Sequence, residues 1–191
     1  MVFDETYFKS SNYTNYLERK IRYKKIAQEL IAYLSYLKIL LPNSKLLDYG
    51  CAVGFLVCGF REQKYQCEGY DISDWSKEEA KKYGIEFIPL FERKFDIMFA
   101  LDVFEHMSDI DIEKALQVFN PDTLIVRIPC STDGGKRFHL DISRKDPTHI
   151  NCKTKQQWID FFTNHRYVYF DCVDLYTVYD TDGVMCYICK K

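Results

Sequence analysis

The chain has 191 residues, of which 47% are hydrophobic and 28% are charged, and its formal net charge is −2. This composition is typical of a globular protein and excludes a collagen-like or largely disordered chain. The near balance of charges argues against a protein that coats nucleic acid. No apolar run approaches the roughly 18–20 residues that span a bilayer, and the start of the sequence lacks the pattern of a secretory signal. We therefore expect a cytoplasmic protein without a membrane segment.

Helices and strands are predicted to alternate along the chain. An amphipathic helix is expected over residues 14–41, where Leu and Ile recur at helical spacing until Pro42. Short apolar segments after it predict strands, and the periodic or polar segments between them predict helices. The strands are expected at residues 45–49, 66–71, 85–88, 95–101 and 123–128, and the helices at residues 53–62, 73–82 and 103–119.

The last third of the chain has a different pattern. Residues 131–150 are rich in Gly, Asp, Arg and His and lack periodicity, and so long a loop is more often functional than idle. A helix is expected over residues 154–164, followed by two strands, 166–179 and 184–189, that form a hairpin. The whole order predicts a doubly wound α/β fold with a seven-stranded, mostly parallel sheet and an antiparallel C-terminal hairpin. We expect one domain, with an N-terminal helical segment over residues 1–42 and a sheet core over residues 43–191.

Two motifs follow the first and second predicted strands. Gly50 and Gly54 lie in the turn after residues 45–49, where a missing Cβ lets the backbone approach a ligand closely. Asp71 ends the second strand, about 20 residues farther along, where an acidic side chain accepts hydrogen bonds from a ribose diol. Each feature alone also fits an ordinary turn or an exposed acid. Their order favours a nucleotide-type cofactor at the carboxyl end of the strands.

A third motif, FDIMFALDVFEHM, runs from a buried strand into a predicted helix that carries Glu105 and His106. Together, LLDYGCAVGFL, GYDIS and FDIMFALDVFEHMSD resemble the class I S-adenosylmethionine (SAM)-dependent methyltransferases, and the later DPTHIN segment resembles their small-molecule O-methyltransferases. The resemblance covers residues 45–165 well. It implies a Rossmann-like methyltransferase fold, with SAM as the cofactor.

The resemblance also implies which residues bind the cofactor. In the family, the acid before the glycine loop and the loop itself face the methionine part of SAM, and the acid after the second strand holds the ribose. Ala52 departs from the family pattern, in which glycine is common at this position. The implied cofactor-binding residues are Asp48, Gly50, Cys51, Ala52, Gly54, Asp71, Ile72 and Leu101.

Methyl transfer to a hydroxyl also requires removal of the acceptor's proton, by a base or by a metal ion that lowers the hydroxyl pKa. His149, in the long loop, is the first candidate base, and His139 shares that loop. His106 lies beside the expected cofactor site, whereas His165 lies near a helix end. We predict His149 and His106 as catalytic residues. The alternative for His149 is an anchor that binds the backbone of its own loop.

A metal site is the other alternative at this place. Asp102, Glu105, His106 and His149 resemble the Glu-x-x-Glu-His and later His of metal-dependent relatives, among them RNA 3′-end 2′-O-methyltransferases. Asp replaces the first Glu here, however, and the Glu-His pair also occurs in relatives without metal. We therefore expect catalysis without a metal ion.

The N-terminal segment is dense in aromatic residues, with Tyr7, Phe8, Tyr13, Tyr16 and Tyr23. We predict that residues 4–13 form a mobile lid over SAM and the acceptor. Ordinary packing of an amphipathic helix is the alternative.

The sequence thus predicts an enzyme that moves a methyl group from SAM to a small-molecule acceptor, at oxygen. Two other functions stay open: a non-catalytic SAM-binding or regulatory subunit, and an RNA-terminal 2′-O-methyltransferase-like enzyme with a metal site. The identity of the acceptor and the oligomeric state are not encoded in any motif that we can recognise.

Overall fold

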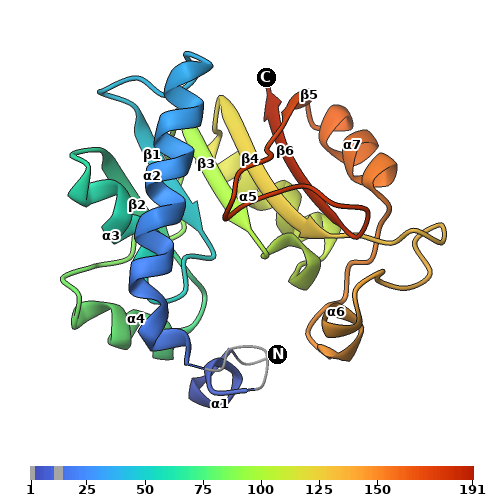
Figure 1. The fold of residues 1–191 in the computed structure, drawn as a ribbon, viewed down its shortest axis with the longest axis horizontal. Helices are drawn as coiled ribbons and strands as arrows, with labels where there is room; N and C mark the ends of the chain where they lie inside the picture. Colours follow the sequence, from blue (N-terminus) through green and yellow to red (C-terminus); the bar gives the residue numbers. More distant parts are fainter. Residues whose placement is uncertain (1–2, 11–14) are drawn as a thin grey trace. The chain divides into compact units, whose positions relative to one another are not determined.

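A computed structural model describes residues 3–10 and 15–191 (Figure 1). Residues 11–14, which include Tyr13 of the expected lid and the first residue of the expected helix, lie outside the described residues. The chain divides into two compact units, Met1–Leu90 and Phe91–Lys191. In the described part of the chain no helix combines the length and the apolar character needed to cross a bilayer.

The first unit begins with helical segments: α1 (Glu5–Phe8), the 3₁₀ helix η2 (Tyr16–Arg19) and α2 (Lys20–Tyr36). The helix predicted over residues 14–41 therefore ends earlier, at Tyr36. Lys38 adopts a positive φ of 58°, and the amides of Ile39 and Leu40 both donate to the carbonyl of Leu34. These bonds satisfy a carbonyl in the last turn and close the helix before Pro42 is reached.

Strands β1 (Lys45–Tyr49) and β2 (Gln66–Tyr70) pair in parallel in this unit, with α3 (Phe55–Glu62) between them in sequence and α4 (Asp74–Lys81) after them. The strand predicted at residues 85–88 is reduced to one parallel bridge, between Gly69 and Phe87. Pro89 follows directly and has no amide hydrogen with which to extend a ladder. The described residues accordingly form six strands, so the predicted count of seven was one too high, whereas the α/β class is confirmed.

The second unit carries the other four strands: β3 (Ile97–Leu101), β4 (Thr123–Pro129), β5 (Val168–Cys172) and β6 (Val184–Lys190). β3 and β4 are parallel, β6 runs antiparallel to β4, and β5 pairs antiparallel with β6, as the predicted hairpin requires. The spatial order is β3-β4-β6-β5, with α7 (Lys155–Asn164) beside the hairpin (Figure 1).

The helix predicted over residues 103–119 is divided in two. A 3₁₀ turn, η3 (Phe104–His106), follows β3, and α5 (Asp109–Phe119) begins only after Ser108. The Ser108 hydroxyl accepts a hydrogen bond from the amide of Asp111, which is the bond of a helix N-cap. The division gives Glu105 and His106 a separate turn of their own at the carboxyl end of β3.

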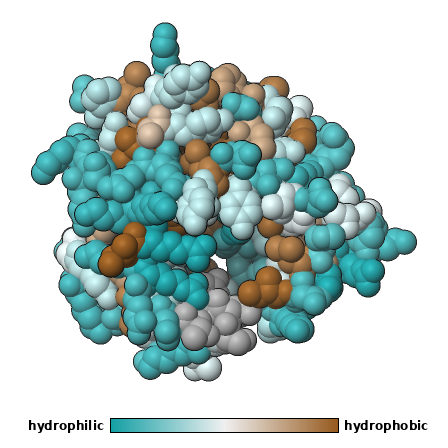
Figure 2. Space-filling view, viewed as in Figure 1, coloured by the Kyte–Doolittle hydropathy of each residue, from teal (hydrophilic) through white to brown (hydrophobic). Residues whose placement is uncertain are grey.

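The surface is mixed in character. On the face drawn in Figure 2, hydrophobic residues are interspersed with hydrophilic ones. This is the pattern expected from a chain in which 28% of residues are charged, with both signs nearly equal.

Candidate active site

The glycine loop of the first unit connects β1 to α3. Gly54 has a φ of 77°, which strains any other residue, and a Cβ built on it would lie 2.5 Å from Cδ1 of Ile85 and would have to displace that side chain. Ala52 also lies in the left-handed region, with a φ of 48°. This explains why glycine suits that position, because a Cβ adds strain there.

Asp71 holds this loop in place. Its Oδ2 accepts a hydrogen bond from the amide of Ala52 at 2.8 Å, and its Oδ1 accepts one from the amide of Ser73, also at 2.8 Å. The side chain is nearly buried, and this burial raises the pKa of Asp71 to about 6, although the two amides act in the opposite direction. Sequence reasoning predicted Asp71 as the residue that binds the ribose and did not foresee its bond to the loop backbone.

The other residues predicted to bind the cofactor differ in exposure. Asp48 and Cys51 are buried, and burial together with the nearby Asp71 carboxylate raises the pKa of Asp48 well above its usual value. Ile72 is 69% exposed, which leaves its side chain accessible to a ligand. Leu101 belongs to the second unit, where it ends β3.

Aromatic side chains of the N-terminal segment pack beside the glycine loop. Phe8 and Tyr16 form a buried cluster with Val53 and Phe55. The ring of Phe8 also stacks on Trp75 with 4.9 Å between centroids. The segment thus covers the residues that follow Gly50.

In the second unit, the residues that follow β3 and β4 meet. The amides of Ile150 and Asn151 donate to the carbonyl of Glu105, at 2.8 and 3.0 Å. The side-chain amide of Asn151 donates to the carbonyl of Met107 at 2.9 Å. These bonds tie the end of the 131–150 loop to η3 and place His149 beside Glu105.

Glu105, His106 and His149 form one cluster, in which the possible metal-ligating atoms all lie within 4.8 Å of one another. Oε1 of Glu105 is 3.9 Å from Nε2 of each histidine. The two imidazole rings meet edge to face, with 4.6 Å between centroids. The structure thus brings together both predicted catalytic residues, His149 and His106.

Burial favours the uncharged form of each member of this cluster. Glu105 has no exposed surface, and desolvation raises the pKa of its carboxyl well above its usual value. Desolvation lowers the pKa of His106 to about 4 and also lowers the pKa of His149. Both imidazoles are therefore neutral near pH 7 and can offer a lone pair.

Asp102 lies close enough to the cluster for its charge to raise the pKa of all three members, but its carboxylate is paired with another residue. Its carboxylate forms an ion pair with Arg127 of β4, and its own amide donates to the carbonyl of Arg127 at 2.7 Å. A φ of 58° turns the backbone at Asp102 as β3 ends. In the described part of the chain, the group that could hold a metal ion includes Glu105 but not Asp102.

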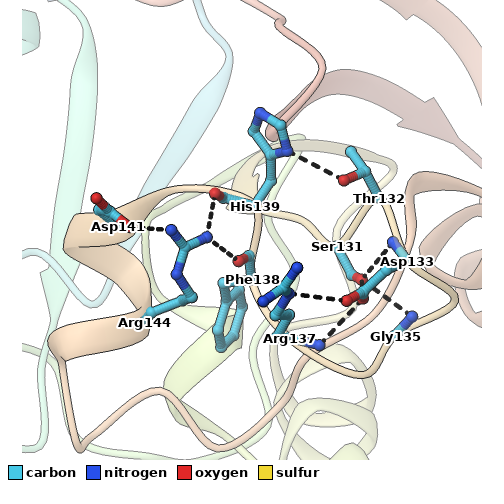
Figure 3. A network of polar contacts seen from close by, with 9 residues as sticks. All are labelled: Ser131, Thr132, Asp133, Gly135, Arg137, Phe138, His139, Asp141 and Arg144. Atoms are coloured by element: carbon cyan, nitrogen blue, oxygen red, sulfur yellow. Dashed lines mark hydrogen bonds and ion pairs between the residues drawn. The ribbon is translucent and has the colours of Figure 1, made fainter.

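Hydrogen bonds within the 131–150 loop fix its shape (Figure 3). Asp133 accepts a hydrogen bond from the Ser131 hydroxyl and pairs with Arg137. Arg144 pairs with Asp141 and also donates to the carbonyl of Phe138. The Phe138 ring packs edge to face against His149, with centroids 5.2 Å apart. Phe138 of the loop thus packs against one side of the cluster. Sequence reasoning did not predict this contact, because nothing in the local pattern distinguishes Phe138.

The remaining two histidines lie elsewhere. Nδ1 of His139 is 3.0 Å from the Thr132 hydroxyl (Figure 3). The His139 ring also lies against Gly183, where an added Cβ would be 2.7 Å from its Cδ2. Nδ1 of His165 donates to the carbonyl of Phe161 at 2.7 Å. Neither histidine belongs to the cluster, so both serve as controls for it.

The fold and the glycine loop are those of a class I methyltransferase, and comparisons with known proteins agree. A family model described as a methyltransferase domain matches residues 16–168. The chain therefore belongs to the SAM-dependent methyltransferase family, and SAM is its cofactor. A comparison with curated proteins finds no match.

Solved structures share the fold at low sequence identity. Magnesium protoporphyrin IX methyltransferase from Synechocystis PCC 6803, with bound SAH, is 18% identical, with a TM-score of 0.68 over 99% of this chain and 96% of its own. A SAM-dependent methyltransferase from Clostridium acetobutylicum is 16% identical, with a TM-score of 0.67, and the match covers 94% of this chain and 97% of the other. A complex between the Haloferax volcanii Trm112 methyltransferase activator and a methyltransferase gives 10% identity and a TM-score of 0.66, and the match covers 100% of this chain and 99% of the other.

Proposed function

We propose that this chain transfers the methyl group of SAM to an oxygen of a small-molecule acceptor, and that His149 and His106 activate that oxygen. The observation that carries the proposal is the meeting of two imidazoles at one buried carboxyl group. A carboxylate or thiolate acceptor needs little activation, whereas a hydroxyl must lose its proton before or during attack. The cluster therefore suits a hydroxyl.

The glycine loop of the first unit would bind SAM, with the backbone around Gly50 and Gly54 against the methionine part and Asp71 on the ribose. The activated oxygen would attack the methyl carbon in line with the sulfonium. The carbon–sulfur bond breaks, its electron pair stays on sulfur, and S-adenosylhomocysteine leaves. The chain's own contribution is to align these atoms and to exclude water.

The test is formation of S-adenosylhomocysteine from SAM with panels of small hydroxyl, carboxylate, amine and thiol compounds. We expect turnover with a hydroxyl compound and transfer of the labelled methyl group to its oxygen. With that acceptor, His149→Ala should lower the rate by about 10²–10⁴-fold while SAM affinity stays intact.

His139→Ala is the matched control, because His139 shares the loop but not the cluster. We expect it to keep the wild-type rate. A preserved rate in His149→Ala would remove His149 from catalysis. Turnover confined to amines or thiols would refute the assignment to oxygen.

A further inference from the structure

We propose that Glu105, His106 and His149 bind a divalent transition-metal ion of the Zn²⁺ type. The inference rests on the proposed function only for what the ion does in catalysis, since binding of the ion can be measured without turnover.

The first support is a buried carboxyl group whose polar atoms are unsatisfied. Glu105 has no exposed surface, and neither of its oxygens has a hydrogen-bond partner among residues 3–10 and 15–191. A buried polar group without a partner costs on the order of a hydrogen bond or more, so proteins rarely keep one without a use. Oε1 of Glu105 lies 3.9 Å from Nε2 of each imidazole, so the three side chains are close enough to share one ligand.

The second support is the spacing of the three groups. The 3.9 Å between Oε1 of Glu105 and each Nε2 is too long for a direct hydrogen bond. Two ligand atoms that each lie about 2.0–2.2 Å from one ion are themselves roughly 3–4 Å apart. One ion can therefore replace the missing hydrogen bonds with little movement of the side chains.

The third support is the orientation of His106. Its Nδ1 lies 2.8 Å from the Thr148 hydroxyl and 3.3 Å from the Thr148 carbonyl, and a carbonyl can only accept. The Thr148 hydroxyl itself donates to Asp146. Nδ1 of neutral His106 therefore carries the proton, and Nε2 presents a lone pair toward Glu105. This is how an imidazole that binds a metal is usually fixed.

The ligand set indicates the kind of ion. Two imidazoles and one carboxylate suit Zn²⁺ or Fe²⁺, whereas Mg²⁺ prefers oxygen ligands and water. Three protein ligands also leave a coordination position for the acceptor oxygen. Bound there, the hydroxyl would ionise at neutral pH and release its proton to solvent before it attacks the methyl group.

Asp102 no longer weighs against such a site. In the sequence, the replacement of the first Glu by Asp favoured catalysis without a metal ion. In the structure Asp102 pairs with Arg127 and is not needed as a ligand, because the other three residues already form the cluster.

The experiment is titration of the full chain, first stripped with a chelator, with Zn²⁺ and separately with Mg²⁺, by calorimetry. Co²⁺ serves as a spectroscopic probe of imidazole ligation. We expect one equivalent of Zn²⁺ per chain, bound far more tightly than Mg²⁺. Glu105→Gln and His149→Ala should each weaken Zn²⁺ binding by at least about 100-fold, since removing a ligand exceeds the effect of losing a supporting residue.

His139→Ala and His165→Ala should bind Zn²⁺ as the unmodified chain does, because neither residue is in the cluster. Thermal unfolding and SAM binding of each variant show that its fold is intact. Zn²⁺ affinity that is unchanged in folded Glu105→Gln, or absent from the unmodified chain, would overturn the proposal.

The metal site and the proposed function fail in different ways. Stoichiometric Zn²⁺ binding without methyl transfer to any hydroxyl would leave the site standing and refute the function. Undiminished methyl transfer in excess chelator, with no Zn²⁺ bound, would refute the site and leave the function standing.

Discussion

Nδ1 of His106 lies 2.8 Å from the hydroxyl oxygen of Thr148, although 42 residues separate the two along the chain. The hydroxyl in turn donates to Asp146, whose Oδ1 also accepts a hydrogen bond from the amide of Thr148 at 2.9 Å. The relay from Asp146 through Thr148 fixes both the tautomer and the direction of the His106 ring. Thr148 is therefore a positioning residue, which acts on the site through His106.

Thr148→Val should damage the site without touching the cofactor loop. It keeps the shape of the side chain but removes the hydroxyl, so His106 loses the partner that orients it. We expect Zn²⁺ affinity to fall by about 10–100-fold, with a matching loss in kcat and no change in SAM affinity. Thr148→Ser, which retains the hydroxyl, should recover most of both. A Thr148→Val protein with normal Zn²⁺ affinity would show that the relay only supports the loop.

Asp71→Ala should weaken SAM binding by about 1.5–3 kcal/mol, the worth of hydrogen bonds to a charged group. Calorimetry measures the change. Asp74→Ala is the matched control, because that carboxylate is three residues away and its side chain is 96% exposed. Equal SAM affinities for Asp71→Ala and the unmodified chain would remove Asp71 from the cofactor site.

SAM affinity should rise with pH through about pH 6. Burial raises the pKa of Asp71 to about 6, so its carboxyl is protonated in the unliganded fold below that value. Only the ionised carboxylate can accept hydrogen bonds from both ribose hydroxyls, so binding should weaken by up to about tenfold per pH unit below pH 6. Asp48 and Lys77 also act on Asp71, so the decisive measurement is Asp71→Asn, whose affinity should vary much less with pH.

The raised pKa of Asp71 has the opposite effect on folding stability, which should fall as pH rises. The unfolded carboxyl ionises near 3.8, whereas the folded one holds its proton up to about pH 6. The stability that this proton contributes is fully present below pH 3.8 and is lost as pH rises to 6. Denaturant titrations of the unliganded chain should show this loss, and Asp71→Asn should lack it.

The N-terminal segment should gain protection when ligands bind. Phe8 stacks on Trp75 and packs with Tyr16 beside the glycine loop, so closure over the cofactor would strengthen existing contacts. Hydrogen exchange over residues 3–10 should slow with SAM and acceptor together, and Phe8→Ala should abolish that slowing. Ile21→Ala is the control, since Ile21 is 82% exposed. Identical exchange with and without ligands would mean ordinary packing rather than a lid.

Local patterns in the sequence were enough to predict the first two strands, β1 and β2. The strand at Lys45–Tyr49 appears with the predicted bounds, and the glycine turn and Asp71 follow where expected. The strand at residues 85–88 was wrong because apolar spacing cannot show whether a partner edge will be paired along its length. The helix at residues 103–119 was wrong at its start because Ser108 offers a cap that interrupts it.

The candidate site was predictable as a list of residues but not as an arrangement. His149 and His106 were chosen by residue type and by their place after strands. Their meeting depends on the bonds from Ile150 and Asn151 to Glu105, which join segments more than 40 residues apart. The ion pair between Asp102 and Arg127, which keeps Asp102 out of the cluster, depends on the register of β3 and β4. In that register Leu101 lies opposite Arg127. No periodicity in the sequence encodes either contact.

The way in which the 131–150 loop is held has a consequence for the proposed acceptor specificity. Residues 146–151 are bonded to η3 and carry His149, so substitutions there should impair the proposed activation of the acceptor. Residues 132–137 are held mainly by bonds to Ser131 and to Asp133, within the same part of the loop. A chimaera that exchanges only residues 132–137, and so keeps Phe138 against His149, should therefore acquire a different acceptor range while its reaction stays the same. Natural divergence and engineering would then both change the acceptor range through this short part of the loop.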